Sequence, residues 1–162
     1  MTVTVRRIRP DDGPLLKRVR LAALLDTPSA FSRTHEEESA YTDDEWARRA
    51  ADWSAGGEAM TSFAELDGEI VGLVGGHRTI PGTTELVSMW VDPAARGNRV
   101  GQALIDAVAE WAVGEPIELW VTHGNDPAVA LYARAGFTVT TEVQPLASDP
   151  CRNEIRMRRS GA

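Results

Sequence analysis

The stretch ELVSMWVDPAARGNRVGQALIDAVAEWAV, residues 85–113, decides the fold and contains the most informative chemistry. The apolar run at residues 86–91 predicts a strand, which ends before Pro93 because a proline cannot donate in the middle of a sheet. Apolar side chains then recur at helical spacing over residues 100–111, and Gly114 supplies a stop signal. This stretch therefore predicts a strand, a short loop and a helix in that order.

The loop between this strand and this helix has the composition of an anion site. The free N–H groups and the positive dipole end of a helix N-terminus together favour phosphate. Arg96 and Arg99 add charge that persists at any physiological pH. Neither GxxxxGK(S/T) nor GxGxxG occurs, so the Walker loop and the dinucleotide fingerprint are both excluded. An ordinary exposed turn with solvated arginines is the alternative.

Two motifs resemble the GCN5-related N-acetyltransferase (GNAT) family. Residues 96–101, RGNRVG, are similar to its pyrophosphate loop Q/R-x-x-G-x-G/A, and residues 125–137, NDPAVALYARAGF, look like its N…A…LYxxxGF segment. Arg99 departs from the pattern, because it stands where the family most often has glycine. A side chain at Arg99 is tolerable if that residue has right-handed helical dihedrals, because its amide then still points at a ligand.

Periodicity and turn signals over the rest of the chain give the order β-α-α-β-β-β-α-β-α-β-β, which matches the GNAT arrangement. Asp67-Gly68 predicts a hairpin, and the glycines of residues 72–76 suggest a bulge or a close approach. Residues 29–40 are interpreted as a solvated stretch and residues 145–152 as a loop. The expected class is mixed α/β: a largely antiparallel sheet flanked by about four helices and, as the resemblance implies, splayed between its fourth and fifth strands.

Length and composition indicate one globular domain covering residues 1–162, with 43% hydrophobic and 25% charged residues. A net charge of −7 argues against a nucleic-acid partner. No apolar run reaches membrane-spanning length, and residues 1–10 lack the apolar block of a secretion signal. The single Cys151 has no ligand cluster around it, so we expect a cytoplasmic protein without a metal.

The resemblance implies a cofactor site for acetyl-CoA between the strands ending at Val91 and Thr122, which would separate at a bulge near Trp90. A backbone N–H near Val91 would hold the thioester oxygen, and the amides of residues 98–102 would bind the pyrophosphate. Asn125 would meet the pantetheine arm or order its loop, with a plain helix cap as the alternative. The residues expected at the cofactor are Trp90, Val91, Arg96, Gly97, Asn98, Arg99, Val100, Gly101, Gln102 and Asn125.

The same resemblance suggests two catalytic residues. Tyr132 would be the general acid that protonates the departing thiolate, although a buried tyrosine packed on Phe137 is the alternative. Glu85 would be a general base acting through water, with an exposed strand-end glutamate as its alternative. His77 and His123 are lesser candidates for the base.

The expected function is therefore transfer of an acetyl group from acetyl-CoA to a primary amine, by direct attack in a ternary complex. A non-catalytic acyl-CoA-binding sensor and an enzyme that uses a longer acyl-CoA are the alternatives. The acceptor stays open, since residues 24–53 and 145–152 would shape its pocket and carry no decodable motif. Trp90 and Trp120 could line the cleft, and a homodimer is one expected assembly, because dimers are common in the family.

Overall fold

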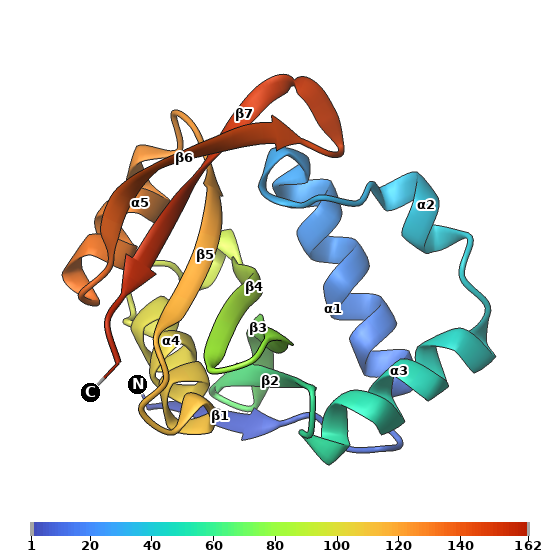
Figure 1. The fold of residues 1–162 in the computed structure, drawn as a ribbon. Coiled ribbons are helices and arrows are strands. Elements are labelled where there is room, and N and C mark those ends of the chain that lie inside the picture. The colour runs from blue at the N-terminus through green and yellow to red at the C-terminus, as the bar shows by residue number, and fades with distance from the viewer. Residues whose placement is uncertain (1, 162) are drawn as a thin grey trace.

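A seven-stranded mixed sheet forms the centre of the molecule, in the order β1-β2-β3-β4-β5-β7-β6 (Figure 1). The computed structural model describes residues 2–161, so residues 1 and 162 of the expected domain lie outside the described part. Neighbouring strands are antiparallel except for β4 and β5, which are parallel. The strands are β1 (Val3–Arg7), β2 (Ala59–Leu66), β3 (Glu69–Ile80), β4 (Thr83–Val91), β5 (Ile117–Thr122), β6 (Thr138–Leu146) and β7 (Asp149–Arg159).

Helices cover both faces of the sheet and divide the apolar core into two clusters. The larger cluster lies under α4 and α5, and the smaller one lies under α1 and α3, with the short α2 beside α1 (Figure 1). The expected mixed α/β class is thereby confirmed. The helices are α1 (Gly13–Asp26), α2 (His35–Ser39), α3 (Asp43–Ala55), α4 (Val100–Ala112) and α5 (Asp126–Arg134), with 3-10 turns η1 (Pro28–Ala30) and η2 (Pro93–Ala95).

Local sequence signals explain several of these elements. Asp67 (φ 53°) and Gly68 (φ 83°) both adopt positive φ, as the predicted tight hairpin between β2 and β3 requires. Thr42 and Glu45 form the reciprocal capping box that starts α3. At Gly72 a Cβ atom would lie 2.8 Å from the Trp90 carbonyl oxygen, so the expected close approach in β3 is confirmed.

The interpretation of residues 29–40 as a solvated stretch is only partly correct, since Glu36 and Glu37 are exposed but Phe31 and Glu38 are buried. A capping box of Thr34 and Glu37 starts α2 there, and Glu38 is only 5% exposed. Its carboxylate accepts a hydrogen bond from Arg20 Nε at 2.8 Å. A buried carboxylate must be paired, and the partner lies on another helix where the local charge pattern does not show it.

The prediction of a loop over residues 145–152 is also wrong. Strands β6 and β7 continue into a tight hairpin in which Leu146 faces Asp149. A proline disfavours a central strand because it has no N–H to donate. Pro145 is tolerated because it lies on β6, an edge strand that has a neighbouring strand on one side only. Figure 1 shows this hairpin arching toward the segment after α1, and the Ser148 hydroxyl donates to the Phe31 carbonyl oxygen.

Candidate functional site

The sheet opens between its two parallel strands. The β4–β5 ladder consists of Thr84 opposite Ile117 and Glu85 opposite Glu118, and pairing ends there although β4 continues to Val91. A bulge in β4 accompanies the separation, because Leu73 pairs with Trp90 while Gly75 pairs with Val87, and Ser88 between them has φ 57°. The splay expected between the fourth and fifth strands is therefore confirmed.

The backbone of Val91 faces this opening. The Asp92 N–H donates to the Val71 carbonyl at 2.7 Å, and successive residues of an antiparallel ladder point to opposite sides. The N–H and C=O of Val91 therefore point away from β3, toward the side from which β5 has separated. Its carbonyl accepts a hydrogen bond from Arg96 Nε at 3.1 Å, whereas its N–H is directed at the opening.

The loop from β4 to α4 presents a run of free amides. Helix α4 begins at Val100 with no side-chain cap, and its first backbone bond across the helix start runs from the Ala103 N–H to the Arg99 carbonyl. Within residues 2–161 the amides of residues 97–102 have no hydrogen-bond acceptor. Convergent unpaired amides at the positive end of a helix form an anion site.

The backbone at Arg99 does not have the right-handed conformation under which a side chain there would be tolerable. Arg99 has φ 61° and ψ 21°, in the left-handed region, and Gly97 (φ 86°) is also left-handed. A non-glycine residue in this conformation costs about 1 kcal/mol or more. The turn from the loop into α4 requires this conformation. The spacing of apolar residues in the sequence does not reveal such a requirement.

Arg96 and Trp90 share one acceptor at the end of α1. The Oδ2 atom of Asp26 accepts hydrogen bonds from Trp90 Nε1 at 3.0 Å and from Arg96 Nη2 at 2.8 Å. The Trp90 indole, followed by Thr27 and Arg96, holds the pKa of Asp26 below its ordinary value. In this structure both side chains therefore link the end of α1 to β4 and the loop after it. The Arg96 side chain is engaged with Asp26, so only the Arg96 backbone belongs to the run of loop residues.

The other predicted loop residues make local contacts. Asn98 Nδ2 donates to the Ala95 carbonyl at 2.9 Å, and Gln102 Nε2 donates to Asp106 at 2.9 Å. Val100 is a core residue, 1% exposed. A Cβ atom at Gly101 would lie 2.8 Å from Leu131 Cδ2, so this glycine permits close packing of α4 against α5.

Tyr132 lies on α5, and Asn125 directly precedes that helix. The Tyr132 ring lies in the core under α4 and α5, 6% exposed, and packs edge-on against Phe137 with centroids 5.8 Å apart. Burial raises the pKa of its phenol above the ordinary value, so the hydroxyl keeps its proton. Asn125 is the N-cap, with its side chain accepting from the Ala128 N–H at 3.4 Å, as in the plain capping alternative.

A cavity of about 500 Å³ lies on the α1–α3 side of the opening. Glu85 lines it beside its cross-strand neighbour His77, and Trp120 lines it from β5, whereas Trp90 lies under α1 and is not among its lining residues. Two further carboxylates line it: Glu38, paired with Arg20, and Glu154, 7% exposed and bonded by Gln144 Nε2 at 2.6 Å. Sequence reasoning missed Glu38 and Glu154, and no local signal marks them.

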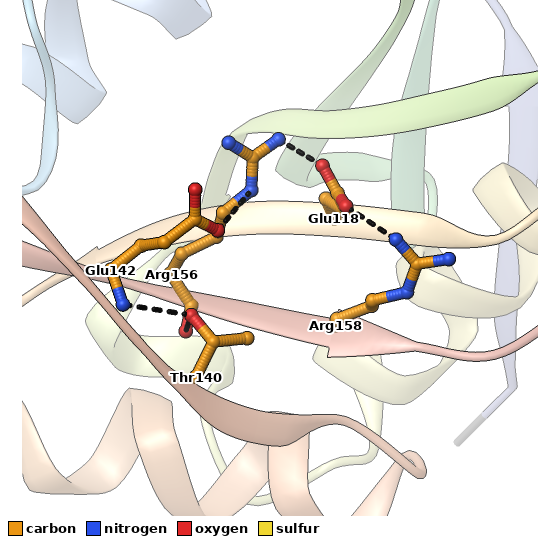
Figure 2. A network of polar contacts seen from close by, with 5 residues as sticks. All are labelled: Glu118, Thr140, Glu142, Arg156 and Arg158. Carbon is orange, nitrogen blue, oxygen red and sulfur yellow. Dashed lines mark hydrogen bonds and ion pairs between the residues drawn. The ribbon is translucent and has the colours of Figure 1, made fainter.

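A polar network supports the β5 wall of the cavity. Figure 2 shows Glu118 on β5 between Arg156 and Arg158 of β7, with Arg158 Nη1 2.8 Å from Glu118 Oε1. Arg156 also lies 3.6 Å from Glu142, and its guanidinium is 5.2 Å from the centroid of the Trp120 ring. Glu118 is thereby neutralised beside Glu85, which has no ion pair within residues 2–161.

Metal clusters and membrane-spanning helices are both absent from the described residues. Across residues 2–161, no cluster of three or more His, Cys, Asp or Glu side chains suited to a metal ion is present. No helix within the same range has the length and apolar character needed to cross a membrane.

Comparison with known proteins gives a consistent result. Residues 21–137 match the Acetyltransferase (GNAT) family. The mycothiol acetyltransferase of Mycobacterium avium (strain 104) is 32% identical over 170 residues, covering 89% of this chain and 54% of that protein. The mycothiol acetyltransferase of Sanguibacter keddieii is 31% identical, covering 88% of this chain and 46% of that protein. The chain thus spans about half the length of these curated relatives.

A solved structure shares the fold over the whole chain. The GNAT superfamily phosphinothricin acetyltransferase of Sinorhizobium meliloti, in complex with AcCoA, superimposes with a TM-score of 0.80 at 18% identity. The alignment covers 100% of this chain and 90% of that chain.

Proposed function

Since the chain belongs to the GNAT acetyltransferase family, we propose that it transfers the acetyl group of acetyl-CoA to a primary amine in a ternary complex. The observation that carries the proposal is the opening between β4 and β5. Free amides of the β4–α4 loop lie at its rim, and a cavity lined by Glu85 lies on its α1–α3 side. One anionic cosubstrate and one acceptor could thus meet at the same strand.

We place the cosubstrate along β4. The amides of residues 97–102 would bind the pyrophosphate, where the α4 dipole adds positive potential. The pantetheine arm would pair with the β4 backbone that has lost β5 as a neighbour. The Val91 N–H, which faces the opening, would then donate to the thioester oxygen and stabilise the charge that develops there.

The chemical step follows from this placement. The amine must first lose a proton, and Glu85 would accept it through water. The nitrogen lone pair then forms the C–N bond, the nitrogen passes its surplus proton to water, and the tetrahedral intermediate collapses with cleavage of the C–S bond. CoA leaves as a thiolate, to which the Tyr132 hydroxyl would donate a hydrogen bond or its proton. Burial keeps this phenol protonated, as a donor must be.

The direct test is release of CoA thiol from acetyl-CoA over a panel of amines, with the acetylated amine identified by mass spectrometry. Amine-dependent release of CoA thiol, at the same rate as the acetylated amine forms, supports acetyl transfer. Tight acetyl-CoA binding without release over the whole panel would instead support an acyl-CoA-binding sensor. Parallel assays with longer acyl-CoA thioesters test whether acetyl is the preferred group.

Four finer proposals accompany the activity. The described chain would form one domain, and an exposed single cysteine agrees with a reducing, cytoplasmic location. A homodimer is proposed as the assembly, to be checked by sedimentation. The relatives' name makes mycothiol-type compounds one group for the amine panel, although only about half of each relative is matched.

A further inference from the structure

Two buried hydrogen-bond donors on the α3 wall of the cavity lack acceptors. Trp46 Nε1 and Arg49 Nη1 are both buried without a hydrogen-bond partner within residues 2–161, and both residues line the cavity. Trp46 is only 1% exposed. An unpaired buried donor costs about 1–3 kcal/mol, more for a charged group, so two such donors on one cavity wall favour a ligand that carries acceptor atoms.

The guanidinium of Arg49 is held in place by aromatic rings instead of by a carboxylate. It lies 3.9 Å from the centroid of the Tyr41 ring and 5.7 Å from that of Trp46. Among the described residues Arg49 has no ion pair, whereas Arg20 on the same cavity is neutralised by Glu38 at 2.8 Å. Arg49 is therefore an oriented positive charge that the protein leaves uncompensated.

The β4 wall of the cavity has the opposite character. Glu85 lines it without an ion pair in the described part of the chain, beside His77, its partner across the β3–β4 ladder. An ammonium or amine group is favoured near Glu85, and an anion is favoured near Arg49. A cavity of about 500 Å³ has the size of sites that enclose small molecules.

We propose that the acceptor is a small amine that carries a carboxylate, with the carboxylate bound by Arg49 and the Trp46 indole and the amine directed to Glu85. This rests on the proposed acetyl transfer and assigns its acceptor class. Arginine presents a planar fork that matches both carboxylate oxygens, and the indole N–H is a third donor. Contact with the Tyr41 and Trp46 rings orients the Arg49 side chain before binding, which limits the rotamer entropy lost when the ligand binds.

The first experiment compares matched acceptors. CoA thiol release is measured with the protein amino acids, each as the free acid and as its carboxamide. We expect kcat/KM to be roughly 10- to 100-fold higher for free acids, as expected for charge-assisted hydrogen bonds. Arg49→Met should abolish that preference, and Arg49→Lys should restore part of it. Arg48→Met, at the exposed neighbouring position on α3, is the control and should keep the full preference.

The second experiment measures binding apart from turnover. Calorimetric titration with the same free acids should show affinity in the parent and Arg48→Met that Arg49→Met loses, at unchanged acetyl-CoA affinity. Carboxylate binding without thiol release would support the carboxylate site at Arg49 but refute acetyl transfer, and with it the assignment of the acceptor. Turnover that is indifferent to the carboxylate or to Arg49 would refute the inference and leave acetyl transfer standing. The absence of both binding and turnover for every free acid would overturn the inference.

Discussion

Arg99 adopts a backbone conformation that glycine occupies at little cost, and this residue decides the course of the loop from β4 to α4 at residues 92–99, the proposed anion loop. With φ 61° it turns the chain into α4 and leaves the preceding and following amides unpaired. Its side chain is exposed, so the same residue adds charge at the loop and strain in the backbone.

These two effects of Arg99 can be separated by Arg99→Gly. The substitution removes the strain of a left-handed side chain, so we expect the free energy of unfolding to rise by about 1 kcal/mol, less the added chain entropy of glycine. Acetyl-CoA affinity should fall, because a cation near the phosphates is lost. Thermal unfolding and calorimetry measure the two quantities. A fall in both stability and affinity would show that φ at this position is not strained.

Tyr132 is the residue on which the proposed departure of the thiolate depends. Tyr132→Phe keeps the ring against Phe137 and removes the hydroxyl, so we expect kcat to fall roughly 10²- to 10⁴-fold with little change in acetyl-CoA affinity or Tm. Because burial raises the pKa of this phenol, its ionisation should not reduce kcat as pH rises to about 10. Parental kcat where chemistry limits turnover would remove Tyr132 from the acid role.

Glu85 has a separate test in the pH dependence of the rate. Glu85→Gln should lower turnover most toward low pH, where the acceptor amine is protonated and a base is needed most. Acetyl-CoA affinity should hardly change, since Glu85 lies on the acceptor side of the opening. Superimposable pH–rate profiles of variant and parent would assign the deprotonation to another group, such as His77 or solvent.

At the scale of elements, the end of α1 is fastened to β4 and to the anion loop through Asp26. Its carboxylate accepts from Trp90, Thr27 and Arg96, residues that lie on three different segments. An ordered loop has fewer conformations to lose on binding, so this contact should preorganise the phosphate site.

Asp26→Asn tests this fastening through its pH dependence. The pKa of Asp26 is lowered in the folded state, so the carboxylate stabilises the fold above its unfolded pKa of about 4 and loses this effect as pH falls through the lower, folded value. We expect the variant to be about 1 kcal/mol less stable at pH 7 and nearly equal to the parent in strong acid. Denaturant titrations over this pH range measure the difference. A pH-independent difference would assign the effect to packing.

For the whole molecule, the proposed cosubstrate and acceptor regions are formed by different parts of the chain. The anion loop joins β4 to α4, while the cavity is lined from α1, α3, both sides of the opening and the β6–β7 hairpin. Both regions can therefore be occupied at once, which direct transfer requires.

Initial-rate kinetics test this arrangement. With acetyl-CoA and the amine varied together, double-reciprocal plots should intersect, because both substrates bind before either product leaves. Parallel lines would instead indicate an acetylated enzyme. The exposed Cys151 is the obvious alternative nucleophile, and Cys151→Ser should leave kcat unchanged.

Sequence by itself determined the local elements: the strand, loop and helix of residues 85–113, the Asp67-Gly68 hairpin and the Thr42 cap. Each depends on hydrogen bonds and side-chain spacing within a few residues, which a pattern can express. The family resemblance extended this to the splay of the sheet and to the proposed cofactor residues.

Tertiary structure alone decided the partners of the charged and polar side chains. Arg96 meets Asp26, 70 residues away, and Arg20 meets Ser88, 68 residues away. The left-handed backbone of Arg99, the burial of Glu38 and the unpaired donors of Trp46 and Arg49 were equally hidden. These features arise where distant segments meet, and which segments meet depends on strand register and on the crossing of helices over the sheet, which local spacing does not encode.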